Sequence, residues 1–333
     1  MNRKLLAAIA LSLLATSAQA LTFKIATLSP DGSGWMTKMR AGANEVKTRT
    51  EGRVDFKFYT GGTMGNDKAV LNKIRIGQLQ GGAITGGSLA EHVRDIQVYS
   101  LPLKFKTFDE VDFVRGKMDA GFAKALEDAG FVNFGFAEGG FAYAMSKNAP
   151  VSSIAALRRQ RVWIPDNDRQ SEEALKSFRV TPVPLSLGDV LPSLQTGIID
   201  TVASSPIGAV ALQWHTQVKY LTDLPMSYFV GTLAIDRKAF AKASPEDQAV
   251  IREVMGRVFR DINAQNRKDN VAAYNALIKQ GIQVVKPSEA ELAEWTREGN
   301  VATDSMEKSG VVTRQAADQL DAHLSAFRNG KKS

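Results

Sequence analysis

Charged and hydroxyl side chains directly follow two short apolar runs in the middle of the chain. Asp168 and Arg169 come after the run RVWIP, and Ser204 and Ser205 come after the run IIDTVA. Short apolar runs that alternate with helical patterns are typical of a parallel sheet covered by helices. Ligands bind such sheets beyond the carboxyl ends of the strands. These four side chains therefore predict a binding site for a small molecule.

The same residue types also allow a test for catalysis. The pairs Asp166 with Asp168 and Glu172 with Glu173 precede or open a predicted helix, where acids act as caps and complement the helix dipole. The three histidines are far apart and lack a metal-ligand spacing, and no serine elbow, phosphate loop or dinucleotide fingerprint occurs. The chain has no cysteine, which excludes disulfides, thiolate ligands and a thiol nucleophile. We expect no catalysis, no cofactor and no metal site.

Three tryptophans lie next to predicted strand ends. Side chains alternate along a strand, so Val162 and Ile164 would pack on one face while Trp163 points to the other. Trp35 opens the helix after the first strand, and Trp214 follows the second serine loop. Each of them taken alone fits a core position better than a pocket. Together they provide the aromatic surface that a small-molecule site needs.

The predicted elements form an α/β fold whose helices and strands alternate. We expect strands near 22–26, 54–58, 131–137, 141–145, 161–165, 181–185, 198–203, 228–235 and 282–285, and helices near 35–49, 66–77, 109–129, 245–280 and 289–308, with two more after Asn167 and Leu187. Residues 96–105 read as an apolar loop, the two strands near 140 as separated by Glu138-Gly139-Gly140, and the last residues as a loosely patterned tail.

A weak internal repeat relates two parts of the chain. Residues 74–83 align without gaps on residues 194–203, and each segment combines a helix end, a glycine and a short strand. The first copy leads to Thr85 and Gly86, and the second leads to Ser204 and Ser205. The alignment predicts two related lobes that offer strand-end loops to one site, although any helix–glycine–strand junction would look similar.

One helix is too long for a single lobe. Ser244 and Pro245 form a strong start signal, and nothing stops the apolar pattern before Gly281. At 1.5 Å per residue this helix is roughly 50 Å long. We expect it to run behind both lobes, with a kink near 263–270 as the alternative.

The first twenty residues read as a secretory signal peptide. Arg3 and Lys4 precede an apolar run and the small-residue site Ala18-Gln19-Ala20, so the mature chain would begin at Leu21. An uncleaved N-terminal anchor is the alternative, and the well-formed cleavage site argues against it. No later run is long enough to span a membrane. Loss of the signal reduces the net charge from +7 to +5, with no basic stripe, so we expect no nucleic-acid partner. The sequence predicts a soluble exported protein, and the family resemblance described below implies the periplasm.

Two segments carry a resemblance to a known family. PVPLSLGDVLPSLQTGIID, from Pro182 to Asp200, and HTQVKYLTD further on resemble the DctP-type solute receptors of tripartite ATP-independent periplasmic (TRAP) transporters. The resemblance implies a two-lobed fold like that of periplasmic binding proteins, with crossing strands and a long lobe-spanning helix. Lobe 1 would hold residues 21–140 and 228–250, lobe 2 residues 141–227 and 251–286, and a C-terminal helix and tail residues 287–333. It also implies that the lobes close on an organic acid and pass it to the ion-driven permease subunits of the transporter.

Two positions depart from the family pattern. The strand written K-I-R-V-P in the family is RVWIP here, so Trp163 takes the place of the carboxylate-binding arginine, and Ala142 takes the place of a second arginine. The bidentate clamp for a carboxylate is therefore missing. Either Arg169 or the backbone N–H groups at the Asp168 helix start hold the acid, or the ligand carries no carboxylate. Trp163 favours a flatter or more apolar solute.

The sequence thus predicts a transport receptor that binds its solute without chemistry. A periplasmic enzyme or a ligand-sensing receptor on the same fold is the alternative, because fold does not dictate function. The residues expected to bind the ligand are Trp35, Thr85, Gly86, Trp163, Asp168, Arg169, Ser204, Ser205 and Trp214.

Overall fold

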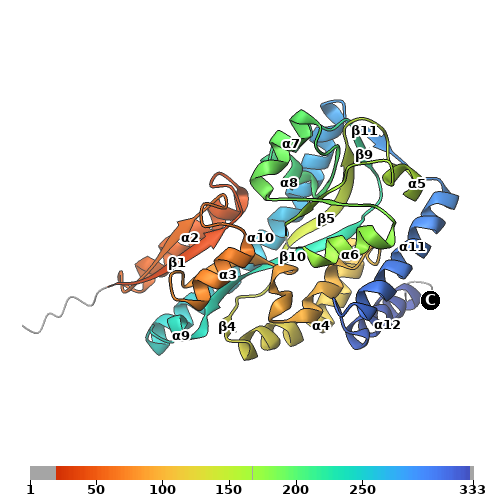
Figure 1. Ribbon diagram of the computed structural model, residues 1–333. Helices are drawn as coiled ribbons and strands as arrows, with labels where there is room; N and C mark the ends of the chain where they lie inside the picture. Colours follow the sequence, from red (N-terminus) through yellow and green to blue (C-terminus); the bar gives the residue numbers. More distant parts are fainter. Residues whose placement is uncertain (1–19, 167, 331–333) are drawn as a thin grey trace, which may run out of the picture.

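The structure of the protein, a computed structural model, describes residues 20–166 and 168–330 (Figure 1). The expected signal peptide, apart from Ala20, lies outside these residues, and so does Asn167. None of the helices in the described ranges combines the length and the apolar character that a membrane span requires.

One mixed sheet runs through the whole molecule in the order β11-β9-β5-β10-β3-β1-β2, with β4 on β10 and β8 on β5. Strands β1, β2 and β3 are parallel, whereas β10 is antiparallel to β3 and to β5. A separate pair, β6 and β7, is parallel. The strands are β1 (Leu21–Thr27), β2 (Val54–Tyr59), β3 (Gly81–Thr85), β4 (Phe131–Val132), β5 (Ala137–Ser146), β6 (Trp163–Pro165), β7 (Val183–Leu185), β8 (Thr201–Ser204), β9 (Tyr220–Thr222), β10 (Ser227–Asp236) and β11 (Gln283–Val285).

Helices cover both faces of the sheet in each lobe. In lobe 1, one apolar core lies under α3, α4 and α12, and a second lies under α2, α9 and the first part of α10. In lobe 2, one core lies under α7, α8 and the end of α10, and another lies under α5, α6 and α11. The helices are α2 (Gly34–Arg49), α3 (Asp67–Arg75), α4 (Phe108–Asp128), α5 (Ile154–Leu157), α6 (Arg169–Ser177), α7 (Val190–Thr196), α8 (Pro206–Ala211), α9 (Arg237–Phe240), α10 (Pro245–Lys279), α11 (Glu289–Lys308) and α12 (Arg314–Gly330), with short 3₁₀ turns η1 (Ser88–Glu91), η2 (Arg94–Ser100), η3 (Leu187–Asp189) and η4 (Trp214–Thr216).

Strands β5 and β10 carry the chain from one lobe to the other. The first half of β5 pairs with β10, and the second half pairs with β8 and β9 in lobe 2. The prediction of two strands separated at Glu138-Gly139-Gly140 was wrong, because β5 runs through these residues. The register shifts opposite Phe229 and Val230, and Gly140 adopts φ +92°, which glycine allows at little cost.

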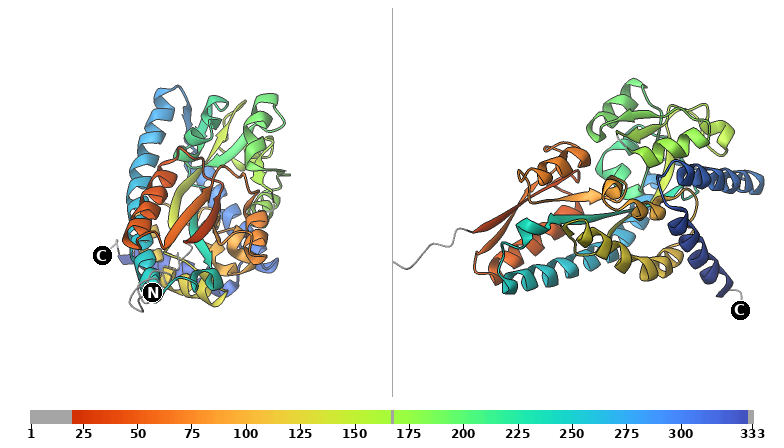
Figure 2. Two further views of the ribbon diagram at one scale, coloured as in Figure 1. Left: turned by 90° about the vertical axis from the view of Figure 1, so that its left-hand side faces the viewer. Right: turned by 60° about the horizontal axis from the view of Figure 1, so that its bottom comes forward.

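The long helix α10 is confirmed as one element of 35 residues without a break at 263–270. The Ser244 hydroxyl caps it by accepting a hydrogen bond from the Asp247 N–H at 3.1 Å. Residues from Ile251 to Ile262 pack into a core of lobe 1, and Leu277 packs into a core of lobe 2. The left view of Figure 2 shows α10 running along both lobes. The expected two-lobed α/β fold with a lobe-spanning helix is therefore confirmed.

Two further expectations had different outcomes. The repeated junctions are structurally alike, because Gly77 and Gly197 end α3 and α7 with φ +77° and +78°, and a strand follows each. The prediction of a loosely patterned tail was wrong, since residues 314–330 form α12. Its residues Ala316, Leu320 and Leu324 lie on one face and are buried in lobe 1.

Candidate functional site

The loop after β3 holds a buried carboxylate in lobe 1. Thr85, exposed at the strand end, donates its hydroxyl to Asp67 Oδ2 at 2.8 Å, and its N–H donates to the same oxygen at 3.0 Å. Asp67 opens α3 and is 5% exposed. Burial raises the pKa of the Asp67 carboxyl, against the effect of the hydrogen bonds from Thr85, and the charge of Asp166 raises it further. This edge of lobe 1 is thus polar and internally bonded.

Gly86 fixes the same loop to the crossing strand β10. Its N–H donates to the Val230 carbonyl oxygen at 2.8 Å. A Cβ atom at Gly86 would lie 3.2 Å from Val230 Cγ2 and 3.3 Å from the Val230 oxygen. A larger side chain would therefore push the loop away from β10.

One hydrogen bond joins this loop region to lobe 2. The side chain of Asn66 caps α3 through the Ala69 N–H and donates its Nδ2 to Asp166 Oδ2 at 2.6 Å. Asp166 directly follows β6 of lobe 2. The segment after β2 in lobe 1 therefore contacts the end of β6 in lobe 2 through Asn66 and Asp166.

Asp168 acts as the cap of α6. Its Oδ1 accepts a hydrogen bond from the Ser171 N–H at 3.0 Å, and its Oδ2 accepts one from the Ser171 hydroxyl at 2.6 Å. The carboxylate thus occupies the helix N-terminus, where the dipole favours negative charge.

Arg169 is exposed and turns toward the C-terminal helices. Its Nη2 donates to the Ser309 carbonyl oxygen, the C-cap of α11, at 2.6 Å. Cations stabilise the carbonyl end of a helix. The guanidinium is therefore engaged with α11 in the described part of the chain.

The two indoles of lobe 2 pack on each other. The ring centroids of Trp163 and Trp214 lie 5.0 Å apart at 76°, and the side chains are 6% and 2% exposed. Trp163 Nε1 donates to the Leu185 carbonyl oxygen at 3.1 Å. Val162 packs into the opposite core, so the predicted alternation of this strand is confirmed. Little of the Trp163 surface reaches solvent.

Ser204 and Ser205 lie where β8 turns into α8, and both are nearly buried. The Ser205 hydroxyl caps α8 by accepting a hydrogen bond from the Gly208 N–H at 3.3 Å. Ser204 pairs with Tyr143 of β5, next to Ala142, which is fully buried. The second predicted loop is thus attached to the crossing strand β5.

Trp35 is half-buried against a core of lobe 1. It lies in the first turn of α2, where Ser33 Oγ accepts from the Met36 N–H. The N–H groups of Gly34 and Trp35 have no hydrogen-bond acceptor among the described residues. They are two donors at a helix N-terminus, which favours anions.

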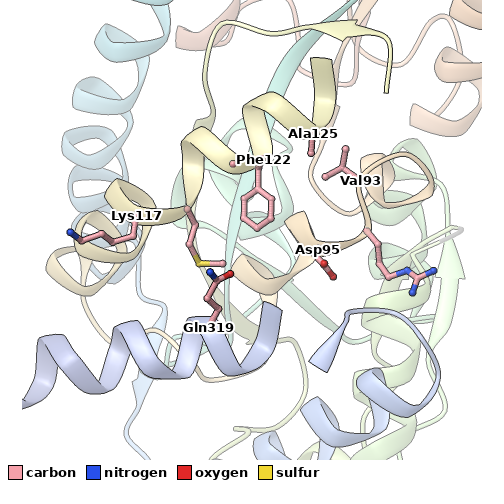
Figure 3. Close-up of a pocket in the computed structure, with 9 residues that line it drawn as sticks. Val93, Asp95, Lys117, Phe122, Ala125 and Gln319 are labelled. Carbon is pink, nitrogen blue, oxygen red and sulfur yellow. The ribbon is translucent and has the colours of Figure 1, made fainter. Parts of the chain in front are cut away.

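Two hollows lie elsewhere on the described residues, and none of the nine predicted residues lines them. One of about 330 Å³ lies between η2, α4 and α12. Figure 3 shows Phe122 and Gln319 facing each other across it, while Lys117 points away.

The other hollow, of about 540 Å³, lies between α4, β5 and α10 beside a buried polar network. Glu138, 1% exposed, accepts from Arg267 Nε at 2.6 Å and from the Tyr228 hydroxyl at 2.7 Å. Arg115 donates to the Tyr228 oxygen at 3.1 Å. Burial raises the pKa of the Tyr228 hydroxyl. Since these groups bond one another, the network fixes the crossing strands to α4 and α10.

Sequence reasoning did not include Asn66 and Asp67 among the expected binding residues. Asn66 only opens the helix expected near 66–77. Its spacing of 100 residues from Asp166 carries no signal, because the hydrogen bond forms only after the lobes fold. No group of three or more metal-ligating side chains occurs within residues 20–166 and 168–330.

Two α/β lobes joined by two crossing strands and one long helix, with strand-end loops that meet between them, define the class of two-lobed solute-binding proteins. The chain matches the family described as bacterial extracellular solute-binding protein, family 7, the DctP family, over residues 25–309. It belongs to this family, whose members are extracytoplasmic receptors.

Two relatives of known ligand class share a low sequence identity with this chain. The chain is 22% identical over 294 residues to the sialic acid-binding periplasmic protein SiaP of Vibrio cholerae, covering 86% of this chain and 89% of that protein. It is 25% identical over 238 residues to the C4-dicarboxylate-binding periplasmic protein DctP of Rhodobacter capsulatus, covering 70% of each.

Solved structures share the fold. A TRAP periplasmic solute-binding protein of Ralstonia eutropha H16 with bound (S)-2-acetolactate has a TM-score of 0.84 at 17% identity, covering 92% of this chain and 99% of that one. A Bordetella pertussis extracytoplasmic solute receptor that binds pyroglutamic acid has a TM-score of 0.82 at 19% identity, covering 92% of this chain and 100% of that one. Such identities establish the fold alone.

Proposed function

We propose that this protein is a periplasmic receptor that binds a small organic acid, or a related aromatic or apolar solute, between its lobes. The observation that carries the proposal is the meeting of the two loop regions at Asn66 and Asp166, in a chain of the DctP family. Sialic acid and C4-dicarboxylates in the names of its relatives support an acid.

The hydrogen-bond donors that could bind the carboxylate of the solute are backbone N–H groups. Trp163 and Ala142 stand at the arginine positions of the family pattern, and Arg169 is engaged with Ser309. The unpaired N–H groups of Gly34 and Trp35 support binding of a carboxylate by backbone donors. Thr85, Gly86, Asp168, Ser204 and Ser205 would line the rest of the site, and Trp163 and Trp214 would back its lobe 2 side.

A thermal-shift panel of organic acids, amino acids and aromatic acids tests this function. A ligand at 100 times its dissociation constant adds about 2.7 kcal/mol to the free energy of unfolding, which raises the melting temperature by several degrees. An unchanged melting temperature over the whole panel would contradict a solute receptor of this kind. Turnover of any panel compound would favour the alternative of an enzyme on the same fold.

We also propose that the receptor delivers its solute to the membrane permease subunits of a TRAP transporter, after export and removal of residues 1–20. The family membership supports both steps. N-terminal sequencing of the exported protein should begin at Leu21. Reconstituted permease should take up the solute only with the receptor present, and receptor-independent uptake would contradict the delivery role.

A further inference from the structure

Three asparagines of α10 bind the backbone of β5 where the chain crosses between the lobes. Asn263 accepts from the Glu138 N–H at 2.8 Å and donates to the Phe136 oxygen at 2.9 Å. Asn266 donates to the Glu138 oxygen at 2.8 Å. Asn270 follows four residues later, and this spacing places all three on one side of the helix. The side-chain amides of α10 thus form hydrogen bonds with the backbone at the start of β5, as a neighbouring strand would.

Asn270 differs from the other two because it also reaches lobe 2. Its Nδ2 donates to the Asn266 oxygen at 3.0 Å and to the Gly139 oxygen at 3.4 Å. Its Oδ1 accepts from the Ile207 N–H in α8 at 3.2 Å. The side chain is nearly buried, at 7% exposure of the residue. One amide therefore links α10, β5 and α8.

The first turn of α8 explains why this link matters. Pro206 has no N–H, the Gly208 N–H donates to Ser205 Oγ, and the Ala209 N–H donates to the Ser205 oxygen. Ile207 carries the amide of this turn that depends on another element. Ser204 and Ser205 lie just before Pro206, so the Asn270 contact is made two residues after the serine loop, in addition to the pairing of Ser204 with β5.

The backbone at the crossing is shaped for the contact. Gly140 has φ +92°, and a Cβ atom there would lie 2.9 Å from Asn270 Nδ2. A Cβ atom at Gly208 would lie 2.7 Å from Ser204 Oγ. Both glycines therefore allow the close approach of Asn270 to β5 and of the serine loop to α8.

We propose that Asn270 is a positioning residue for solute binding, which holds the Ser204–Ser205 loop of lobe 2 in a fixed place relative to the crossing strands. The loop then follows α10 when the lobes move. The inference rests on the proposed function for the role of the loop in binding, but its test needs no solute.

The experiment compares three single variants of the ligand-free protein by hydrogen exchange of the Ile207 amide. Asn270→Ala removes the acceptor, and we expect the amide to exchange about threefold to tenfold faster. Asn270→Asp is neutral at acid pH, since burial against the Asn266 and Gly139 oxygens disfavours its charge, and it then keeps both an oxygen for Ile207 and a donor. At pH 5 its exchange should stay within about twofold of the native rate. Asn263→Ala is the matched control, because it removes one bond to β5 and one to Phe136 just before it but none to α8, and Ile207 exchange should not change.

A second measurement separates the positioning of α8 by Asn270 from a general loss of stability. The chain has no cysteine, so Ala41→Cys on α2 and Ala211→Cys on α8, both exposed, accept spin labels at unique places. Asn270→Ala should broaden the distribution of distances between the two labels. Asn263→Ala should leave this distribution narrow, even if the two variants have the same lowered melting temperature.

Equal Ile207 exchange in Asn270→Ala and the native protein would overturn the proposal, and so would the same exchange and broadening in Asn263→Ala. If Asn270→Ala does not fold, fast Ile207 exchange in Asn270→Asp would overturn it. A negative solute panel would count against the proposed function while leaving these results unaffected.

Discussion

The two lobes contribute different chemistry where their strand-end loops meet. In lobe 1, the exposed Thr85 and the buried Asp67 form a polar edge held by hydrogen bonds. In lobe 2, the strand that leads to Asp166 carries Trp163, whose indole packs on Trp214. A polar edge can exchange its bonds with a solute, whereas a packed indole mainly stabilises its own lobe. At this place lobe 1 thus presents hydrogen-bonded polar groups, and lobe 2 presents a packed pair of indoles.

The largest expected effect tests the lobe 2 side. Trp163→Ala should lower the free energy of unfolding by about 3–5 kcal/mol, because a buried aromatic side chain leaves a cavity and the Leu185 oxygen loses its donor. Urea unfolding measures the change, with Trp35→Ala at a half-buried site as a control that should lose less. A loss below about 1 kcal/mol together with weaker solute binding would place the indole on the interlobe surface instead.

The next effect tests the polar edge of lobe 1. Thr85→Val should lower the free energy of unfolding by about 1–2 kcal/mol, because the Asp67 carboxylate loses a hydroxyl donor while the backbone donor stays. Chemical denaturation at pH 7 measures it. Thr37→Val is a suitable control, since the exposed Thr37 hydroxyl donates to the Ser33 carbonyl oxygen of its own helix turn. Unchanged stability would mean that the hydroxyl bond contributes nothing.

A smaller effect tests the link between the two edges. Asn66→Ser keeps a good helix cap but loses the amide that donates to Asp166, so the cost should be about 0.5 kcal/mol. Asn66→Ala loses both and should cost about 1 kcal/mol more. Thermal unfolding separates the two variants. If they are equally stable, the cap contributes nothing and the prediction is wrong.

The smallest expected effect concerns Asp67, and the direction in which stability changes with pH identifies it. Burial raises the folded-state pKa of Asp67 above its unfolded value, so the native protein loses stability as the pH rises through the folded pKa. Asp67→Asn has no such charge. Its stability relative to the native protein should therefore improve from pH 4 to pH 7, measured by melting temperature. A relative stability that falls over this range would contradict a raised pKa.

The fold could be predicted wherever a local pattern decides the structure. Ser244 and Pro245 announce α10, and the helix start observed there is the predicted one. The prediction of a break at Gly139 and Gly140 was wrong, because pairing with β10 and the side-chain amides of α10 hold these residues in one strand. α12 was missed although Ala316, Leu320 and Leu324 carry a helical spacing, since small and polar residues surround them.

The candidate site could be predicted only in part. Strand-end position predicted Thr85, Gly86 and the serine loop as binding residues, and these stay predictions. The state of Trp163 could not be predicted, since alternation along a strand gives the direction of the indole but not what covers it. The roles of Asn66, Asp166 and Asn270 depend on contacts across the lobes, which no local pattern records.

The path of the chain through lobe 1 sets an order for its assembly. Strand β10 lies between β3 and β5, and residues Ile251 to Ile262 of α10 fill one of the two cores of this lobe. A polypeptide delivered from its N-terminus has neither piece until most of its length has emerged. The first 140 residues alone therefore leave the β3 edge unpaired and apolar surface uncovered, so the nascent chain needs protection from aggregation until its last third arrives.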